Sequence, residues 1–141
     1  MVRIEDADAK AMLGRVQNEL FDLGADLATP GEDFAPSDMT LRVVQSQIDR
    51  LEDEIDTMNE RLEPLRSFIL PGGGEAAARV HVARTVARRA ERSVVTAARE
   101  VSLNPLARTY LNRLSDHLFV LARMLARQEG GDLLWQPGAT R

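Results

Sequence analysis

An unbroken run of apolar residues at alternating spacings of three and four constrains the fold of this chain more than any other feature of its sequence. The run occupies residues 41–65 and consists of Leu41, Val44, Ile48, Leu51, Ile55, Met58, Leu62 and Leu65. Such spacing forms one stripe of an α-helix and is typical of a helix packed in a bundle. It predicts a long helix that begins after Ser37 and Asp38, with acidic outer faces exposed to solvent.

Three further segments have helical periodicity, at about residues 6–27, 75–101 and 106–128. Proline and glycine separate them, in Thr29-Pro30-Gly31, Pro71-Gly72-Gly73-Gly74, Asn104-Pro105 and Gly130-Gly131. No segment has the alternation of a β-strand. We therefore expect an all-α protein, an up-and-down bundle of about four long helices, in which residues 1–141 form a single domain.

The composition excludes several classes of protein and site. The 141 residues contain no cysteine, which excludes disulfides, thiolate metal sites and cysteine nucleophiles. No apolar run approaches the roughly 20 residues that span a bilayer, and no signal peptide is evident, so we expect a cytoplasmic protein, or a matrix-type protein already processed, without a membrane partner. His81 and His117 lack the Glu-x-x-His motif of a bundle di-metal site, so no protein-bound metal is expected.

Charge is distributed unevenly along the chain. Residues 1–64 contain 16 acidic and 6 basic side chains, whereas residues 79–127 contain 10 arginines and 3 acidic side chains. Arginine suits phosphate because its planar fork donates paired, charge-assisted hydrogen bonds. The cluster suggests a site for a polyanion. The sequence pI of about 5.2 and the lack of interleaved aromatic residues argue against nucleic acid.

Two helical stripes could form this site. Arg84, Arg88 and Glu91/Arg92 follow one another at helical spacing, which fits either a solvated basic face or an anion site. On the next helix, Asn112 and Asp116 are one turn apart and are poor choices for a helix interior. We expect Asp116 to face an arginine of the preceding helix, either as a structural salt bridge or to orient a phosphate-binding arginine.

Four stretches and the tail together resemble the ATP:cob(I)alamin adenosyltransferases of the propanediol-utilisation type. They are NELFDLGADLATP at 18–30, SFILPGG at 67–73, HVARTVARRAER at 81–92, YLNRLSDHLFVLAR at 110–123 and the tail DLLWQPG. The resemblance implies a five-helix bundle, assembled as a homotrimer with active sites between subunits. It also implies a reaction in which Co(I) of cob(I)alamin attacks the 5′ carbon of Mg²⁺-bound ATP and expels triphosphate.

The resemblance also assigns roles to residues. The nucleotide-binding positions match Arg84, Arg88, Arg89, Glu91, Arg92 and Asn112. Arg84 matches an arginine that pairs across the subunit interface, and Phe68 matches the aromatic that packs at the corrin and helps to keep the lower ligand off cobalt. Asp116 matches an acidic residue needed near the cobalamin. Asp116, Arg88 and Arg92 make up the expected catalytic set. No catalytic Ser, Cys or His is needed, because Co(I) is itself the nucleophile and the protein only positions the substrates and stabilises charge.

One departure from the family leaves two interpretations open. The family begins with a glycine- and threonine-rich ATP-binding segment of the form TRTGDxGTT and a helix with a VDELN-like motif, and neither is present here. Either these 141 residues belong to a longer enzyme, or the polypeptide is short and acts as a non-catalytic corrinoid-binding or helical interaction module. For the enzyme, a flavin reductase and a cobalamin-dependent mutase are the further partners that the resemblance suggests.

Overall fold

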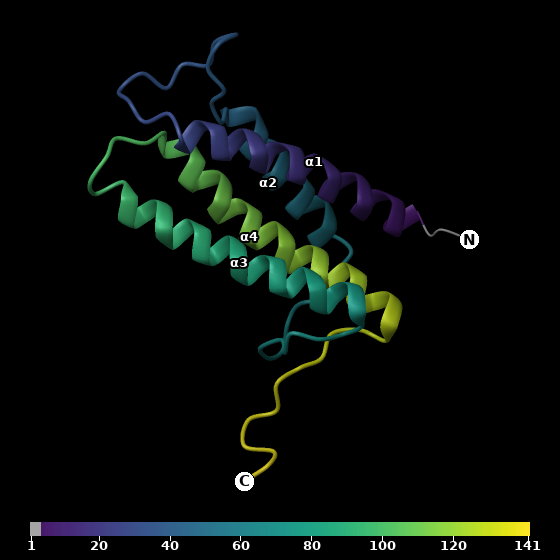
Figure 1. Ribbon diagram of the computed structural model, residues 1–141. Helices are drawn as coiled ribbons and strands as arrows, with labels where there is room; N and C mark the ends of the chain where they lie inside the picture. Colours follow the sequence, from purple (N-terminus) through teal and green to yellow (C-terminus); the bar gives the residue numbers. More distant parts are fainter. Residues whose placement is uncertain (1–3) are drawn as a thin grey trace.

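The computed structural model describes residues 4–141, which form four α-helices and one short 3-10 helix (Figure 1). The helices are α1 (Ile4–Leu27), α2 (Gln45–Asn59), α3 (Glu75–Ala97) and α4 (Pro105–Ala126), and the 3-10 helix η1 spans Arg127–Glu129. Within the described range there are no strands, only two isolated β-bridges. The expected all-helical architecture of four helices is confirmed.

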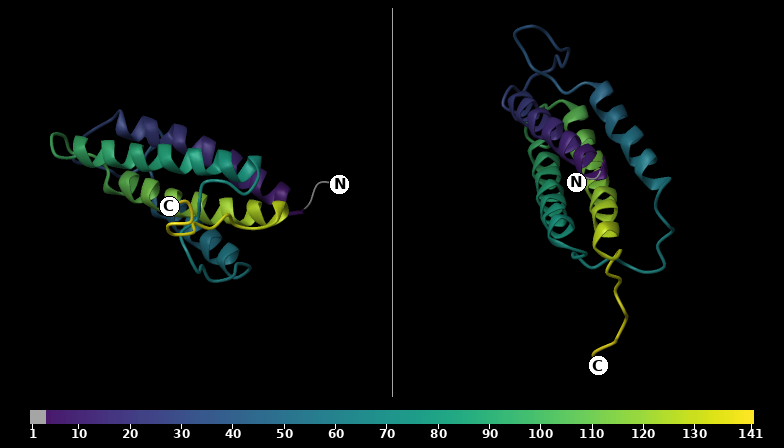
Figure 2. Two further views of the ribbon diagram at one scale, coloured as in Figure 1. Left: turned by 90° about the horizontal axis from the view of Figure 1, so that it is seen from below. Right: turned by 90° about the vertical axis from the view of Figure 1, so that its right-hand side faces the viewer.

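Helix α4 is the centre of the bundle. It contacts each of the other three helices, and the two views of Figure 2 show α1, α2 and α3 arranged around it. Its sequence explains this position, because apolar residues cover most of its circumference rather than one stripe. Leu111, Leu114, Leu118 and Leu121 are all buried, as their spacing predicts. No helix in the described part of the chain is both long enough and apolar enough to cross a membrane.

Helix α2 is shorter than the apolar run predicts. Ile48, Leu51 and Met58 in the middle of the run are buried, but Leu41 and Leu65 lie outside the helix and are 55% and 41% exposed. The helix does not begin earlier because Val44 is extended, while the Arg42 side chain and the Val43 N–H are bound to Asp26. The predicted start after Ser37-Asp38 and the extension to residue 65 are therefore wrong.

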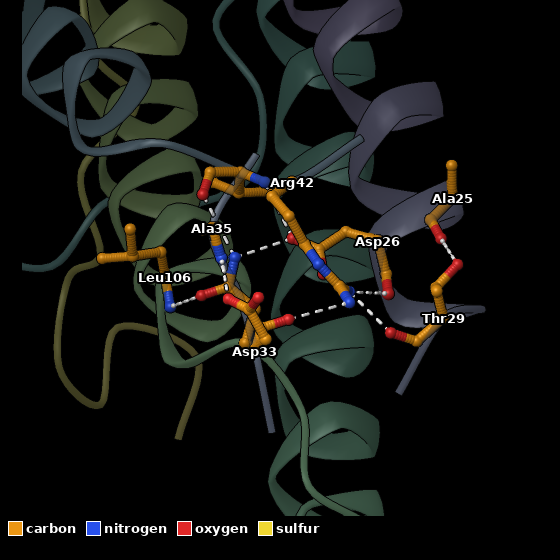
Figure 3. Close-up of polar contacts among 9 residues, drawn as sticks. Ala25, Asp26, Thr29, Asp33, Ala35, Arg42 and Leu106 are labelled. Atoms are coloured by element: carbon orange, nitrogen blue, oxygen red, sulfur yellow. Dashed lines mark hydrogen bonds and ion pairs between the residues drawn. The ribbon is translucent and has the colours of Figure 1, made fainter. Parts of the chain in front are cut away.

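A buried cluster around Asp26 holds this extended segment (Figure 3). Asp26 is 1% exposed, and its carboxylate accepts hydrogen bonds from Arg42 Nη1 at 2.8 Å, Val43 N at 2.7 Å and Asn104 Nδ2 at 2.7 Å. Asn104 also accepts from Leu106 N at 3.1 Å, which caps α4 just before Pro105. The cluster thus joins the end of α1, the loop before α2 and the start of α4.

A second buried network joins the middle of the bundle. Tyr110 donates to Glu19 Oε2 at 2.6 Å, and Arg15 forms ion pairs with Glu19 and Glu54. His117, which is completely buried, lies with Nε2 3.4 Å from Glu54 Oε2. Burial and the hydrogen bond to Glu19 raise the pKa of Tyr110 well above its usual range, so the phenol remains a neutral donor. His117 therefore belongs to the framework of the bundle.

Candidate functional site

Glu91 lies at the contact between α3 and α4 and, with His81, is one of the buried polar residues of the arginine-rich helix. It is 8% exposed, because it is on the same face of α3 as the buried Ala87 and Val94. Arg88 Nη1 donates to one carboxylate oxygen at 2.8 Å, and Asn112 Nδ2 donates to the other at 2.9 Å. Three residues predicted for nucleotide binding therefore meet at one point.

The polar contacts continue along α4 through Arg113. Its Nη2 donates to Asn112 Oδ1 at 2.6 Å and to Asp116 Oδ2 at 2.7 Å. The prediction that Asp116 faces an arginine of the preceding helix is wrong, because its partner lies three residues earlier on its own helix. At this spacing the two side chains share one face of α4, so the half-buried guanidinium of Arg113 reaches the Asp116 carboxylate.

A pocket of about 440 Å³ opens beside this constellation, between the second half of α3 and the start of α4. Its lining includes polar groups of Glu91, Asn112 and Arg108 and apolar groups of Val94, Leu103 and Pro105. Sequence reasoning did not single out Arg108. The signal was present, since Arg108 precedes Asn112 by one helical turn and must share its face. The pocket combines apolar walls with a few convergent polar groups, as ligand sites commonly do.

Arg89 and Arg92 do not reach this pocket. They line a separate, shallower groove of about 400 Å³ with Ser93, Thr96 and Ala97. We expected Arg84, Arg88 and Glu91/Arg92 to form a single stripe on α3. Glu91 and Arg92 instead face different directions, because neighbouring residues are about 100° apart around a helix. Glu91 is buried against α4, whereas Arg92 is exposed.

Arg84 lies one turn before Arg88 and is partly buried. Its guanidinium carbon is 5.7 Å from the centre of the Phe119 ring, a cation–π contact. The buried Nε of Arg84 has no hydrogen-bond partner among the described residues. His81 packs edge-on against the same ring, and burial together with the charge of Arg84 lowers its pKa. His81, Arg84 and Phe119 thus form a cationic and aromatic group on the α3–α4 surface.

Phe68 is 77% exposed and belongs to the loop before α3. The C-terminal tail pairs with this loop through a bridge between Ile69 and Leu134, and Trp135 N donates to Phe68 O at 2.8 Å. The rings of Phe68 and Trp135 are 5.9 Å apart. Within one chain Phe68 is remote from the pocket, since Glu91 lies about 24 Å along α3 from the helix start at a rise of 1.5 Å per residue.

Two glycines let the Phe68 loop enter α3. Gly73 and Gly74 have φ of +93° and +102°, which side chains of L-residues rarely adopt. A Cβ at residue 73 would lie 2.8 Å from Cβ of Ala126, at the end of α4. The loop therefore packs closely against the end of α4 only because glycine occupies this position.

No group of three histidine, aspartate or glutamate side chains within the described residues is placed to hold a metal ion. The polar chemistry of the α3–α4 site consists of guanidinium, amide and carboxylate groups. Such groups bind phosphate and ribose and can stabilise a developing negative charge.

Comparison with known proteins gives the class to which this fold and site belong. Residues 1–125 match the cobalamin adenosyltransferase family. The chain is 51% identical over 131 residues to the corrinoid adenosyltransferase of Mycobacterium leprae, covering 90% of this chain and 68% of that protein. It is 46% identical over 118 residues to the corrinoid adenosyltransferase PduO of Salmonella typhimurium, covering 84% of this chain and 34% of that longer protein.

Solved structures agree with the sequence relatives. A variant of the PduO-type ATP:corrinoid adenosyltransferase of Lactobacillus reuteri in complex with cobalamin and ATP superposes with a TM-score of 0.84 at 36% identity, covering 96% of this chain and 75% of that one. Another variant of that enzyme in complex with ATP gives a TM-score of 0.83 at 35% identity, with the same coverage. The chain therefore belongs to the cobalamin adenosyltransferase family.

Proposed function

We propose that this protein transfers the 5′-deoxyadenosyl group of ATP to cob(I)alamin. A bond forms between cobalt and the 5′ carbon, the bond from that carbon to the triphosphate oxygen breaks, and triphosphate leaves with the electron pair. Family membership supports this reaction, as does the similarity to a corrinoid adenosyltransferase solved with both cobalamin and ATP. The single observation on this chain that carries the proposal is the meeting of Arg88, Glu91 and Asn112 beside a pocket.

The nucleotide occupies the α3–α4 pocket in this proposal. The apolar wall of Val94, Leu103 and Pro105 accommodates the nucleoside, and Asn112 and Glu91 offer a donor and acceptors for its hydroxyl groups. Arg88 at the Glu91 contact and Arg108 in the lining supply positive charge for the phosphates. Mg²⁺ enters with ATP on its phosphate oxygens, as magnesium commonly does in nucleotide sites.

The corrin lies against Phe68 and near Asp116 in the same proposal. The exposed Phe68 ring supplies an apolar surface that excludes water and an axial base from the cobalt. Asp116 is exposed and is held by Arg113, which also holds Asn112 of the nucleotide pocket. Arg113 therefore connects a residue proposed for ATP with one proposed for cobalamin.

A homotrimer with sites between subunits unites these separate parts. Phe68 and the nucleotide pocket lie far apart along one chain, so a neighbouring subunit has to supply one of them. Val82 and Val86 are 63% and 47% exposed on α3, next to the groove of Arg89 and Arg92. We propose that this face meets a second copy, where Arg84, Arg89 and Arg92 contact the shared site. We also propose a cytoplasmic location. In this proposal a flavin reductase supplies the reduced cobalamin, and a cobalamin-dependent mutase receives the adenosylcobalamin.

An anaerobic assay with reduced cobalamin and Mg-ATP tests this function. The full-length protein is expected to convert cob(I)alamin to adenosylcobalamin, followed by the change in its absorbance spectrum, with one triphosphate released per turnover. Omission of ATP is the matched control. Binding of cobalamin with no ATP-dependent product would contradict the proposal and would favour a non-catalytic corrinoid-binding module.

A further inference from the structure

The segment that presents Phe68 is held in place by the C-terminal tail. Leu70 N donates to Leu133 O at 2.8 Å, Trp135 N donates to Phe68 O at 2.8 Å, and Ser67 Oγ donates to Trp135 O at 2.8 Å. The indole of Trp135 then packs against the Phe68 ring. Because Phe68 is largely exposed, its position depends on this pairing rather than on burial in the core.

One buried guanidinium fixes both paired segments just before they meet. Arg123 lies in the last turn of α4 and is 7% exposed. Its Nη2 donates to Glu63 O at 2.7 Å in the loop that leads to Phe68, and its Nε donates to Asp132 Oδ2 at 3.0 Å at the start of the tail. The two contacts lie 60 and 9 residues from Arg123 along the chain, so the side chain joins both of the paired segments to the central helix.

We propose that Arg123 is a positioning residue for the corrin side of the site: it aligns the loop and the tail so that Phe68 is presented with Trp135 behind it. The inference rests on the proposed function in one respect, the contact of Phe68 with the corrin. Arg123 touches neither substrate and acts only through the two segments. Arginine is required because two donors of its rigid fork serve two acceptors at once, which the single ammonium of lysine cannot reproduce in the same geometry.

The chain contains a built-in reporter and a matched control for this proposal. Trp135 is the only tryptophan in the sequence, so emission reports the surroundings of this one side chain, which include the Phe68 ring. Arg127, one turn after Arg123, donates to Arg61 O at 2.7 Å in the same loop. Among the described residues Arg127 makes no hydrogen bond or ion pair with the tail, so replacing it perturbs the loop without removing a polar contact of the tail.

The experiment compares four variants of the full-length protein: Arg123→Lys, Asp132→Asn, Arg127→Gln and Phe68→Ala. Asp132→Asn acts on the tail and keeps the buried arginine, which guards against a simple folding failure of Arg123→Lys. For each variant we measure the wavelength of tryptophan emission and the KM values for cobalamin and ATP. We also measure, by electron paramagnetic resonance, the fraction of bound cob(II)alamin that lacks its lower axial ligand.

Arg123→Lys and Asp132→Asn are expected to shift emission to the red, to raise the KM for cobalamin about tenfold and to leave the KM for ATP within about twofold. Both, like Phe68→Ala, are also expected to lower the fraction of cob(II)alamin without its lower ligand, whereas Arg127→Gln is expected to match the parent protein. If Phe68→Ala changes these values and neither Arg123→Lys nor Asp132→Asn does, the inference is overturned while the proposed function stands. If Phe68→Ala itself changes nothing, the proposed role of Phe68 fails, and the inference fails with it.

Discussion

The carboxylate of Glu91 on α3 accepts a hydrogen bond from the amide of Asn112 on α4 at 2.9 Å. Arg88 holds the other carboxylate oxygen at 2.8 Å, so the glutamate orients one cation and one amide together. Both partners lie where a pocket opens between the two helices. This pair fixes how the arginine-rich helix and the central helix are aligned at the proposed nucleotide site.

Replacing Glu91 with glutamine tests this alignment. The change keeps the shape but removes the charge that orients Arg88, and hydrogen bonds to charged groups contribute about 1.5–3 kcal/mol. We expect kcat/KM for ATP to fall by about 10- to 100-fold, measured under anaerobic conditions. Glu100→Gln, at an exposed position after α3, is the matched control and should match the parent protein. Equal values for the two variants would contradict an orienting role.

Arg108 should contribute to ATP binding although it is not part of the hydrogen-bonded constellation. It lines the α3–α4 pocket, and removing one phosphate-directed charge typically costs about 1–2 kcal/mol. Arg108→Ala is expected to raise the KM for ATP by about 5- to 30-fold and to leave the KM for cobalamin unchanged. Arg99→Ala removes an exposed arginine outside the pocket and controls for net charge. An unchanged KM for ATP in Arg108→Ala would remove Arg108 from the site.

The cluster around Asp26 should be among the most sensitive positions for stability. Asp26→Asn leaves Arg42 buried without its counter-charge, and breaking a buried pair costs about 3–5 kcal/mol. Urea unfolding is expected to show a loss of this size, with Asp38→Asn, at an exposed position, close to the parent protein. A loss below about 1 kcal/mol would show that the cluster is not essential to the bundle.

Glu54 should give the protein part of its acid sensitivity. Burial by itself would raise the pKa of Glu54, but hydrogen bonds from His117 and Arg15 outweigh it, and the pKa lies below the ordinary value of 4.5. Since the folded pKa is lowered, the stabilisation is complete above pH 4.5 and is lost as the pH falls through the folded pKa. Unfolding free energies measured from pH 7 downward should fall less steeply below pH 4.5 in Glu54→Gln. Identical slopes would contradict this assignment.

The fold was largely predictable from the sequence because helical periodicity is a local signal. The spacing of Ile48, Leu51 and Met58 identified the core face of α2. The same run overextended that helix at Leu41 and Leu65, because apolar spacing does not reveal a competing contact. Asp26 binds Arg42 and Val43, which are 16 and 17 residues away in the chain, and no local feature of the sequence predicts such a contact.

The site was predictable only in part, for a related reason. The resemblance to a family assigned Arg88, Glu91 and Asn112 to nucleotide binding. The structure shows that Arg88 and Asn112 both contact Glu91. The partner of Asp116 was assigned to the wrong helix, although the spacing of three residues from Arg113 was visible in the sequence. The contacts of Arg123 with the loop and the tail join segments far apart in the chain, so only coordinates could reveal them.

The role of Arg88 is the central claim, and its replacement by alanine in the full-length protein tests it most directly. The measurement is the anaerobic rate of adenosylcobalamin formation from cob(I)alamin and Mg-ATP, with far-UV circular dichroism to confirm that the helices remain folded. Arg88 is exposed apart from its contact with Glu91, so the bundle should persist while the rate falls by about 100-fold or more. A folded Arg88→Ala protein that retains the full rate would contradict the account.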